Sequence, residues 1–351
     1  MMGKLKKLTG YRLFLPLSCL IIVLLINLIT TPTFFRITIN NGVLYGYIID
    51  VINRASELVV LAVGMTLVVS ASAGTDISVG AVMAVAAAVC TRVLAGGEVS
   101  VNEYANPYVL AVLAALAAAV VCGGFNGFLV AKLKIQPMVA TLMLFTAGRG
   151  ISQLVTNGQI TYIRVDGYKL LGNNIPGIPI PTPIFVAVIV VVLTYILLKK
   201  TAMGMYIQSV GINERASRLV GLKSVKIIWM AYAFCGLCAG IAGLVASSRI
   251  YSADANNIGL NMELDAIAAV ALGGNSLGGG RFSLLGSVIG AYTIQALTTT
   301  LYAMSVPADQ IPVYKAIVVI LIVAVQSEEL KKFRKRLASR HSSKNVEGGV
   351  A

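Results

Sequence analysis

The sequence is short of charge. Charged residues make up 12% of its 351 positions and hydrophobic residues make up 57%, whereas a soluble domain carries about 25% charged residues. The mean hydropathy is +0.85. These values exclude a soluble globular enzyme, and they exclude a disordered chain, which needs low hydrophobicity and high charge. A polytopic membrane protein remains, and the chain is long enough for one helical bundle.

The groups that enzymes and metal sites use are also scarce. The one histidine, His341, lies in the polar C-terminal tail. The glycine-rich segment 272–281 is not followed by the lysine and hydroxyl that hold phosphates and magnesium in a phosphate-binding loop. Paired carboxylates, a nucleophile elbow and a cluster of metal ligands are absent from the sequence. We therefore expect no enzyme activity, and no metal or cofactor, ATP included, bound by this chain.

Small residues are abundant in the apolar runs. All five cysteines lie there, and the Cys-x-x-Cys spacing of Cys235 and Cys238 lacks the βαβ context of a redox site, so we expect buried, inert thiols. Glycines four residues apart permit two helices to approach closely, and we expect such pairs to pack the bundle. The pairs are Gly123–Gly127, Gly236–Gly240, Gly274–Gly278 and Gly286–Gly290.

The basic residues predict the topology. The 28 lysines and arginines exceed the 14 acids, giving a net charge of +14. Most of them lie in four segments, which the positive-inside rule places in the cytoplasm; the segments are 1–12, 132–134, 199–226 and 328–351. An all-α bundle with both termini inside requires an even number of spans. Ten satisfy it: 13–31, 57–73, 79–95, 108–131, 137–156, 183–199, 227–247, 263–276, 283–304 and 311–327.

Two polar segments flanked by glycines interrupt the apolar runs. The first, residues 73–80, places Asp76 and Ser78 between two spans, and the second, residues 273–281, places Asn275 there. Backbone groups freed at a helix break need protein or water partners, so such breaks often line a cavity. Asp76, Ser78 and Asn275 are therefore candidates for a substrate pathway. The repeated pattern is also what two related halves would show.

Three of the pathway candidates, Asp76, Ser78 and Arg149, have plainer structural alternatives. Asp76 and Ser78 could cap a tight turn, with Gly80 allowing close packing. Arg149 lies in the fifth apolar run near Thr146, where a charge is costly unless it faces a cavity or a partner, which makes both residues pathway candidates with Asp76 as one conceivable partner. The alternative for Arg149 is a side chain that reaches towards a membrane interface.

The loop 199–226 is predicted to contain a short amphipathic helix. Asn213 is a good N-cap, Glu214 suits a first turn, and Gly221 suits a helix stop. Such a helix, isolated between two spans, needs either a partner surface or the membrane interface. Its apolar positions are Ala216, Leu219 and Val220, with Arg215 and Arg218 beside them. The residues that we assign to contact with a partner are Gly211, Asn213, Glu214, Arg215, Ala216, Arg218, Leu219 and Gly221.

Three segments in order along the chain resemble the permeases of ribose/galactose-type sugar ABC importers. They are Gly74-Thr-Asp-Ile-Ser-Val-Gly80, Gly211-Ile-Asn-Glu-Arg-Ala-Ser-Arg-Leu-Val-Gly221, and the signature at 263–280 that begins Glu-Leu-Asp-Ala-Ile-Ala and ends in three glycines. The resemblance runs from about residue 50 to 327. Residues 282–286, 295–300 and 315–327 look most like the galactofuranose-importer branch.

The resemblance implies a bacterial inner-membrane permease subunit with a cytoplasmic tail (1–12), a transmembrane permease domain (13–327) and a basic cytoplasmic tail (328–351). An ATPase subunit would use ATP and dock on the 211–223 loop. A periplasmic or lipid-anchored sugar-binding protein would deliver a pentose or hexose, and a second permease subunit, identical or paralogous, would complete the pathway. Three alternatives remain open: a permease of the same architecture for a nucleoside, a branched-chain amino acid or another small solute; an ion-driven secondary carrier; and an intramembrane enzyme.

Overall fold

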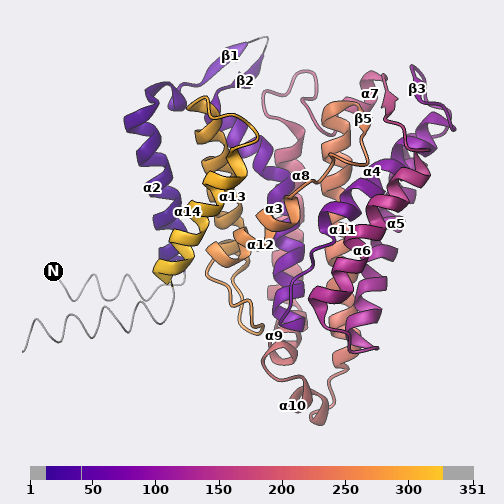
Figure 1. Cartoon of the computed structure of the whole chain (residues 1–351), viewed down its shortest axis with the longest axis vertical. Coiled ribbons are helices and arrows are strands. Elements are labelled where there is room, and N and C mark those ends of the chain that lie inside the picture. The colour runs from indigo at the N-terminus through magenta and orange to yellow at the C-terminus, as the bar shows by residue number, and fades with distance from the viewer. Residues whose placement is uncertain (1–12, 41, 327–351) are drawn as a thin grey trace, which may run out of the picture.

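Each of the ten apolar segments expected to span the membrane is largely helical in the structure, a computed structural model that describes residues 13–40 and 42–326 (Figure 1). The helices are α2 (Phe14–Thr30), α3 (Tyr47–Ser72), α4 (Val79–Ala95), α5 (Tyr108–Ala131), α6 (Pro137–Val155), α8 (Thr182–Lys200), α11 (Ser224–Ile250), α12 (Met262–Leu272), α13 (Leu284–Ala303) and α14 (Ile311–Gln326). Among the described residues, six helices are long and apolar enough to cross a membrane: α3, α5, α6, α8, α11 and α13. The prediction of a polytopic helical membrane protein is confirmed.

Helix α12 differs from the span expected at 263–276. It has 11 residues, so at about 1.5 Å per residue it reaches only about half the hydrocarbon thickness. The chain leaves the helix at Gly273 and Gly274, and Gly274 takes a left-handed φ of +76°. A non-helical segment, 275–283, then leads to α13. The second glycine-rich break is therefore a real interruption, and α12 is a half-helix.

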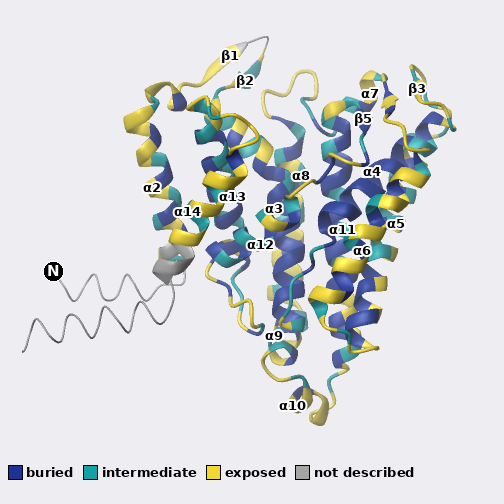
Figure 2. Cartoon of the chain, viewed as in Figure 1, coloured by how far each residue is buried: buried dark blue, intermediate teal, exposed yellow. Residues whose placement is uncertain are grey.

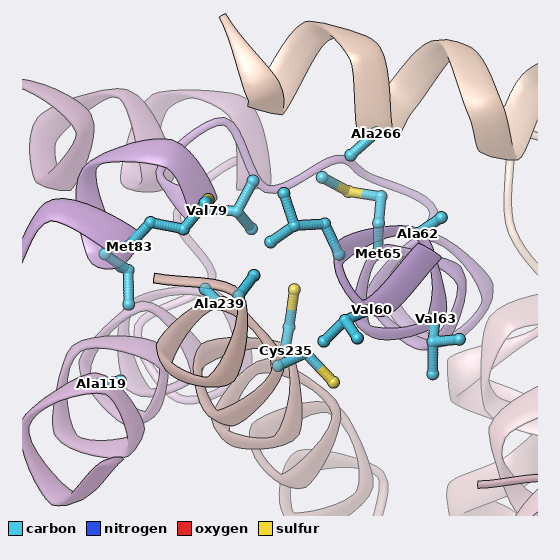
Figure 3. Close-up of a cluster of buried hydrophobic side chains, with 14 of the residues drawn as sticks. Val60, Ala62, Val63, Met65, Val79, Met83, Ala119, Cys235, Ala239 and Ala266 are labelled. Carbon is cyan, nitrogen blue, oxygen red and sulfur yellow. The ribbon is translucent and has the colours of Figure 1, made fainter. Parts of the chain in front are cut away.

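Helices α3 and α11 form the centre of the bundle, and α5, α6 and α8 lie outside them (Figure 2). In its most apolar stretch α3 is 89% buried, whereas α8 is 22% buried. Met65 of α3, Met83 of α4 and Cys235 of α11 meet in this core (Figure 3). Cys19, Cys90, Cys235 and Cys238 are buried, as the sequence predicted, whereas Cys122 is only partly buried.

Glycines bring the inner helices into backbone contact. A Cβ added to Gly236 of α11 would lie 2.9 Å from the Cα of Gly123 in α5, and one added to Gly290 of α13 would overlap the carbonyl of Ala269 in α12. No larger side chain fits at either crossing without moving a helix. The expectation that these glycines pack helices is confirmed for the α5–α11 and α12–α13 crossings. It is wrong for Gly274 and Gly278, which lie in the non-helical segment after α12.

Short strands cap one end of the bundle (Figure 1). At this end β1 (Thr38–Asn40) pairs antiparallel with β2 (Val43–Tyr45), following the 3-10 turn η1 (Pro32–Phe35). Strand β4 (Thr161–Ile163) pairs with β3 (Ser100–Val101) in parallel and with β5 (Ser252–Ala253) antiparallel, and the one-turn helix α7 (Asp166–Lys169) follows β4. This sheet ties together the chain segments that follow α4, α6 and α11.

The opposite end carries two helices of the basic loop. These are α9 (Met203–Ile212) and α10 (Glu214–Leu219), and α10 is the part of the molecule farthest from the strands (Figure 1). The two ends of the bundle therefore have different architectures: a sheet at one and a projecting short helix at the other.

Candidate functional site

Helix α10 is capped at the residues that the sequence indicated. The side-chain Oδ1 of Asn213 accepts a 3.0 Å hydrogen bond from the backbone N–H of Ala216. After the helix, Gly221 adopts a φ of +87°, which most residues avoid. The predicted helix start and stop are confirmed.

A carboxylate holds α10 against the rest of the chain. Oε1 of Glu214 accepts hydrogen bonds from Lys134 Nζ at 2.5 Å, from Arg218 and from Ser224 Oγ at 3.1 Å. Burial raises the pKa of the Glu214 carboxyl, but the hydrogen bonds from Lys134 and Arg218 outweigh it, so this pKa lies below its ordinary value. Lys134 belongs to the turn between α5 and α6, and Ser224 begins α11. Glu214 therefore joins α10 to both of these segments.

The apolar residues around α10 have no cover within the described chain. Leu219 is 90% exposed, Val220 is 78% exposed and Ile212 is 66% exposed. Arg215 and Ala216 are exposed beside them. Exposed large apolar side chains that gather at one projecting point are typical of a surface that binds a partner.

The helix that leads into α10 packs tightly against the end of α3 and the second break in the bundle. The backbone N–H of Gly280 donates a 2.9 Å hydrogen bond to the carbonyl of Ser70 near the end of α3. Gly211, near the end of α9, fits against this pair so closely that an added Cβ would overlap the Ser70 oxygen and lie 2.7 Å from the Gly280 nitrogen. A movement of α10 would therefore reach α3 and the 275–283 segment directly.

Asp76 and Ser78 lie buried in the first break. Oδ1 of Asp76 accepts hydrogen bonds from the backbone N–H of Ser78 at 2.9 Å and from its Oγ at 2.6 Å, and Asn126 of α5 donates to Ser78 Oγ at 2.8 Å. The Ile77 N–H is bound by Thr141 of α6. Protein groups thus satisfy this turn, as in the structural alternative, and Asp76 is 2% exposed.

Asn275 organises the second break. Its Nδ2 donates to the carbonyl of Val270 at 3.0 Å and to Ser287 Oγ at 2.7 Å, while its Oδ1 accepts from the N–H of Ser283 at 2.5 Å. Ser287 in turn lies 2.6 Å from Thr66 Oγ1 of α3. The side chain is 9% exposed, so in this state it connects helices rather than facing an open space.

The other two pathway candidates on α6 point in different directions. Nη1 of Arg149 donates to the carbonyls of Ala255 at 2.9 Å and Ile258 at 2.5 Å. The carboxylates that interact with it electrostatically are those of Glu263 and Asp254, whereas Asp76, the partner considered from sequence, is not among them. Thr146 is exposed on the surface of α6 and hydrogen-bonds its own helix.

A cleft with both polar and apolar lining residues opens at the strand-bearing end, with a volume of about 660 Å³. It opens between α3, α11, α13 and the segment before α12. Its lining residues are Arg54, Glu57, Met83, Ile160, Tyr162, Ala246, Arg249, Ile250, Ser252, Asp254, Asn257, Ile258, Gly259, Leu260, Met262, Asp265, Gln295, Thr298 and Tyr302. None of the five pathway candidates lines it. We name this cavity the outer cleft.

Sequence reasoning missed the outer cleft because its charges stand near span ends, where charge is ordinary. No sequence signal marks it, because its ion pairs join distant parts of the chain. Arg249 of α11 binds Glu57 of α3 at 3.1 Å, and Lys315 of α14 binds Asp265 of α12 at 2.6 Å. In both pairs the two residues are far apart in the sequence, so only the fold brings them together.

The comparisons with known proteins agree with this architecture. The model of the family "branched-chain amino acid transport system / permease component" matches residues 47–326. The chain belongs to this family. It is a permease, not an enzyme. The chain is 44% identical to the galactofuranose transporter permease protein of Escherichia coli (strain K12), over 92% of each chain.

Two further relatives are also named for sugars. The fructose import permease protein of Bifidobacterium longum (strain NCC 2705) is 37% identical over 99% of this chain and 96% of its own, and the ribose import permease protein of Escherichia coli (strain K12) is 35% identical over 89% and 93%. No solved structure matches the chain significantly. The resemblance read from the three ordered segments is confirmed.

Proposed function

We propose that this permease is the transmembrane subunit of an ABC importer that moves a monosaccharide, a pentose or hexose such as galactofuranose, into the cell by alternating access. The relatives named for galactofuranose, fructose and ribose support the solute class. ATP is bound and hydrolysed by a separate subunit, and this chain carries no cofactor of its own.

The proposed orientation places α10 in the cytoplasm and the strand-bearing end outside. The positive-inside rule supports it, because the loop around α9 and α10 carries Lys199, Lys200, Arg215, Arg218, Lys223 and Lys226. Both termini are then cytoplasmic, although their residues, 1–12 and 327–351, lie outside the described part of the chain. In this orientation the outer cleft opens towards the side from which substrate arrives.

The observation that carries the proposal is the surface of α10. A capped, ion-paired helix projects at the basic end with Leu219 and Val220 exposed, and its base is locked to α3 and to the 275–283 segment. A mechanical contact with an ATPase subunit needs this geometry. It needs a rigid apolar surface that projects from the bundle and is joined to the helices that must rearrange.

Two further partners complete the proposed importer. A periplasmic or lipid-anchored sugar-binding protein delivers substrate to the outer cleft. A second permease subunit, a copy of this chain or a paralogue, covers the exposed face of α12, which carries Leu264 (58% exposed) and leads into the non-helical segment 275–283. Irregular backbone at membrane depth is tolerated only where protein or a water-filled cavity surrounds it, which supports a protein partner on this face.

The test replaces the contact surface of α10 without touching its anchoring. We expect Leu219→Ser with Val220→Ser to abolish uptake in the assembled importer while the permease remains folded and the ATPase still hydrolyses ATP. Leu154→Ser is the matched control, because Leu154 is 78% exposed near the end of α6 but lies far from α10 in the fold. Unchanged uptake in the double variant would contradict the assignment of α10.

A permease for a nucleoside, a branched-chain amino acid or another small solute is the second candidate. The description of the matching family names branched-chain amino acids. Competition of labelled sugar uptake by unlabelled leucine or adenosine separates the candidates, and only a sugar competes if the main proposal is right. An ion-driven carrier would transport without an ATPase subunit and would stop when an uncoupler is added.

A further inference from the structure

We infer that the outer cleft is a binding site for a neutral, polyhydroxylated solute, held between α13 and the loop 252–261. The inference rests on the proposed function and adds the place and chemistry of substrate contact. With a volume of about 660 Å³, the cleft lies within the range of about 300–1,000 Å³ typical of small-molecule sites.

The formal charges around the cleft add up to zero. Its lining contains two basic residues, Arg54 and Arg249, and three acids, Glu57, Asp254 and Asp265. Lys315 from the adjoining helix pairs with Asp265 at 2.6 Å, which makes three charges of each sign. A cleft with zero net charge gives an anionic or cationic solute no net electrostatic attraction. The binding of an uncharged solute does not depend on such attraction.

Each of the three carboxylates of the cleft also has hydrogen-bond or ion-pair partners within the protein. Glu57 is bound by Arg249 at 3.1 Å and Asp265 by Lys315. The two oxygens of Asp254 accept from the backbone N–H of Asn256 at 2.9 Å and from the side-chain Nδ2 of Asn257 at 2.6 Å. Every carboxylate among the lining residues therefore already has a partner, and none is free to bind an amine or a metal ion.

The neutral groups of the cleft suit hydroxyls and a sugar ring. Gln295 and Thr298 lie one turn apart on α13, where Gln295 makes only a long 3.3 Å hydrogen bond to Thr299, so its amide is available for exchange with a ligand. Tyr162 and Tyr302, 39% and 55% exposed, add aromatic surface. Amide and hydroxyl groups bind sugar hydroxyls, and aromatic rings pack against the C–H face of the sugar.

The cleft is closed towards the α10 end. Its lining residue Gly259 packs against Gly80 at the start of α4, where an added Cβ on either glycine would overlap the backbone of the other. Farther down, Gly280 and Ser70 are joined by their hydrogen bond. A solute in the cleft can therefore leave only on the side from which it entered until these backbone contacts separate, as a receiving site requires.

The first experiment is protection of an engineered thiol in the assembled importer. Thr298→Cys places a thiol in the cleft, and Thr30→Cys places one at the same end of the bundle on the exposed surface of α2. The native Cys19, Cys90, Cys235 and Cys238 are buried, and Cys122 is partly exposed, so both variants are made in a Cys122→Ser background. A membrane-impermeant maleimide is added without ligand and with galactose, ribose, fructose, adenosine or leucine at millimolar concentrations.

We expect one or more of the sugars to slow labelling of Thr298→Cys at least threefold and to leave Thr30→Cys unchanged. Protection by adenosine or leucine but by no sugar would overturn the ligand class. Protection by none of the five, with sugar uptake by the wild-type importer intact, would overturn the site itself. Absence of sugar uptake by the wild-type importer, by contrast, is a failure of the proposed function and is scored separately from labelling.

The second experiment measures uptake kinetics of the same sugars. Gln295→Leu and Thr298→Val are expected to raise the sugar concentration for half-maximal uptake at least fivefold at saturating binding protein. Thr30→Val is the matched control, since Thr30 and Thr298 both donate a 2.9 Å hydrogen bond to the carbonyl four residues earlier. Unaltered half-maximal concentrations in both cleft variants would contradict the inference, and a fall in maximal rate alone would indicate a structural role.

Discussion

Gly280 donates its backbone N–H to the carbonyl of Ser70 at 2.9 Å, which joins the break after α12 to the C-terminal end of α3. Gly211 of α9 closes over this bond with no space for a side chain. The three segments come from distant parts of the sequence, and they meet where α9 leads into α10. This junction is the route by which a partner on α10 would act on the bundle.

The first prediction concerns Gly211. Because its added Cβ would overlap the Ser70 oxygen, Gly211→Ala forces apart α9 and α3, at a cost of about 1–3 kcal/mol for overpacking. We expect a lower melting temperature in detergent and at least a tenfold loss of uptake.

Gly150→Ala is the control for this change, because nothing lies within 4 Å of an added Cβ there. In the interior of α6, alanine in place of glycine is expected to stabilise by about 0.5–1 kcal/mol. Equal uptake by the two variants would contradict the role given to the junction.

The second prediction concerns Asn275. Asn275→Ala leaves the partly buried N–H of Ser283 without its acceptor and removes one hydrogen bond of Ser287 Oγ, which keeps its contact with Thr66. We expect a loss of about 1–3 kcal/mol of stability, the cost of one unsatisfied group. Asn102→Ala, in the exposed loop between α4 and α5, should change the melting temperature little. Thermal unfolding of the two variants in one detergent checks the difference; a matching pair of melting curves would disprove the structural role of Asn275.

The third prediction is a pH dependence at Glu214. Hydrogen bonds hold its folded-state pKa below the ordinary value, so its contribution to stability is present above the unfolded pKa of about 4.3 and is lost as the pH falls through the folded pKa. The Glu214→Gln variant should melt lower than the wild type at pH 7, by the equivalent of about 0.5–1 kcal/mol. This difference in stability between the wild type and Glu214→Gln should shrink only below about pH 4.3.

Glu98→Gln, which changes an exposed glutamate in the loop between α4 and α5, is the control and should melt like the wild type at pH 7. A gap for Glu214→Gln that closes between pH 5 and 7 would show that the carboxyl titrates above its ordinary range and would refute the stated hydrogen bonding.

The fourth prediction concerns the ion pair of Asp265 and Lys315, whose side chains are 22% and 16% exposed. Lys315→Met leaves an unpaired carboxylate at the edge of the outer cleft and is expected to cost about 1–3 kcal/mol, less than for a fully buried pair. Combined Asp265→Asn and Lys315→Met should recover most of this loss. If the double variant is as unstable as Lys315→Met alone, the pair does not act as a unit.

The sequence was informative where a local pattern decides the structure. Apolar runs and the glycines beside them gave the helices of the bundle, and Asn213 and Gly221 gave the bounds of α10, because capping depends on neighbouring residues. The half-helix α12 was harder, since its apolar run continues through Ala271 and Leu272 and only the two glycines that follow mark its end.

The outer cleft depended on contacts that no local pattern contains. Glu57 and Arg249 are 192 positions apart in the numbering, and they form one ion pair only because α3 and α11 lie side by side at the centre of the bundle. In the opposite sense, Asp76 looked like a pathway residue because it is an acid between apolar runs, whereas its oxygen is occupied by Ser78 in the turn. Pathway roles for Asp76, Ser78, Thr146, Arg149 and Asn275 stay predictions.

The most direct test of the central claim is uptake into proteoliposomes that contain this permease, its ATPase subunit and its binding protein. The account predicts that labelled galactose, ribose or fructose accumulates inside only when ATP and all three components are present, and that an uncoupler has no effect. Sugar accumulation by the permease alone, or no sugar accumulation by a complete and ATP-hydrolysing complex, would contradict it.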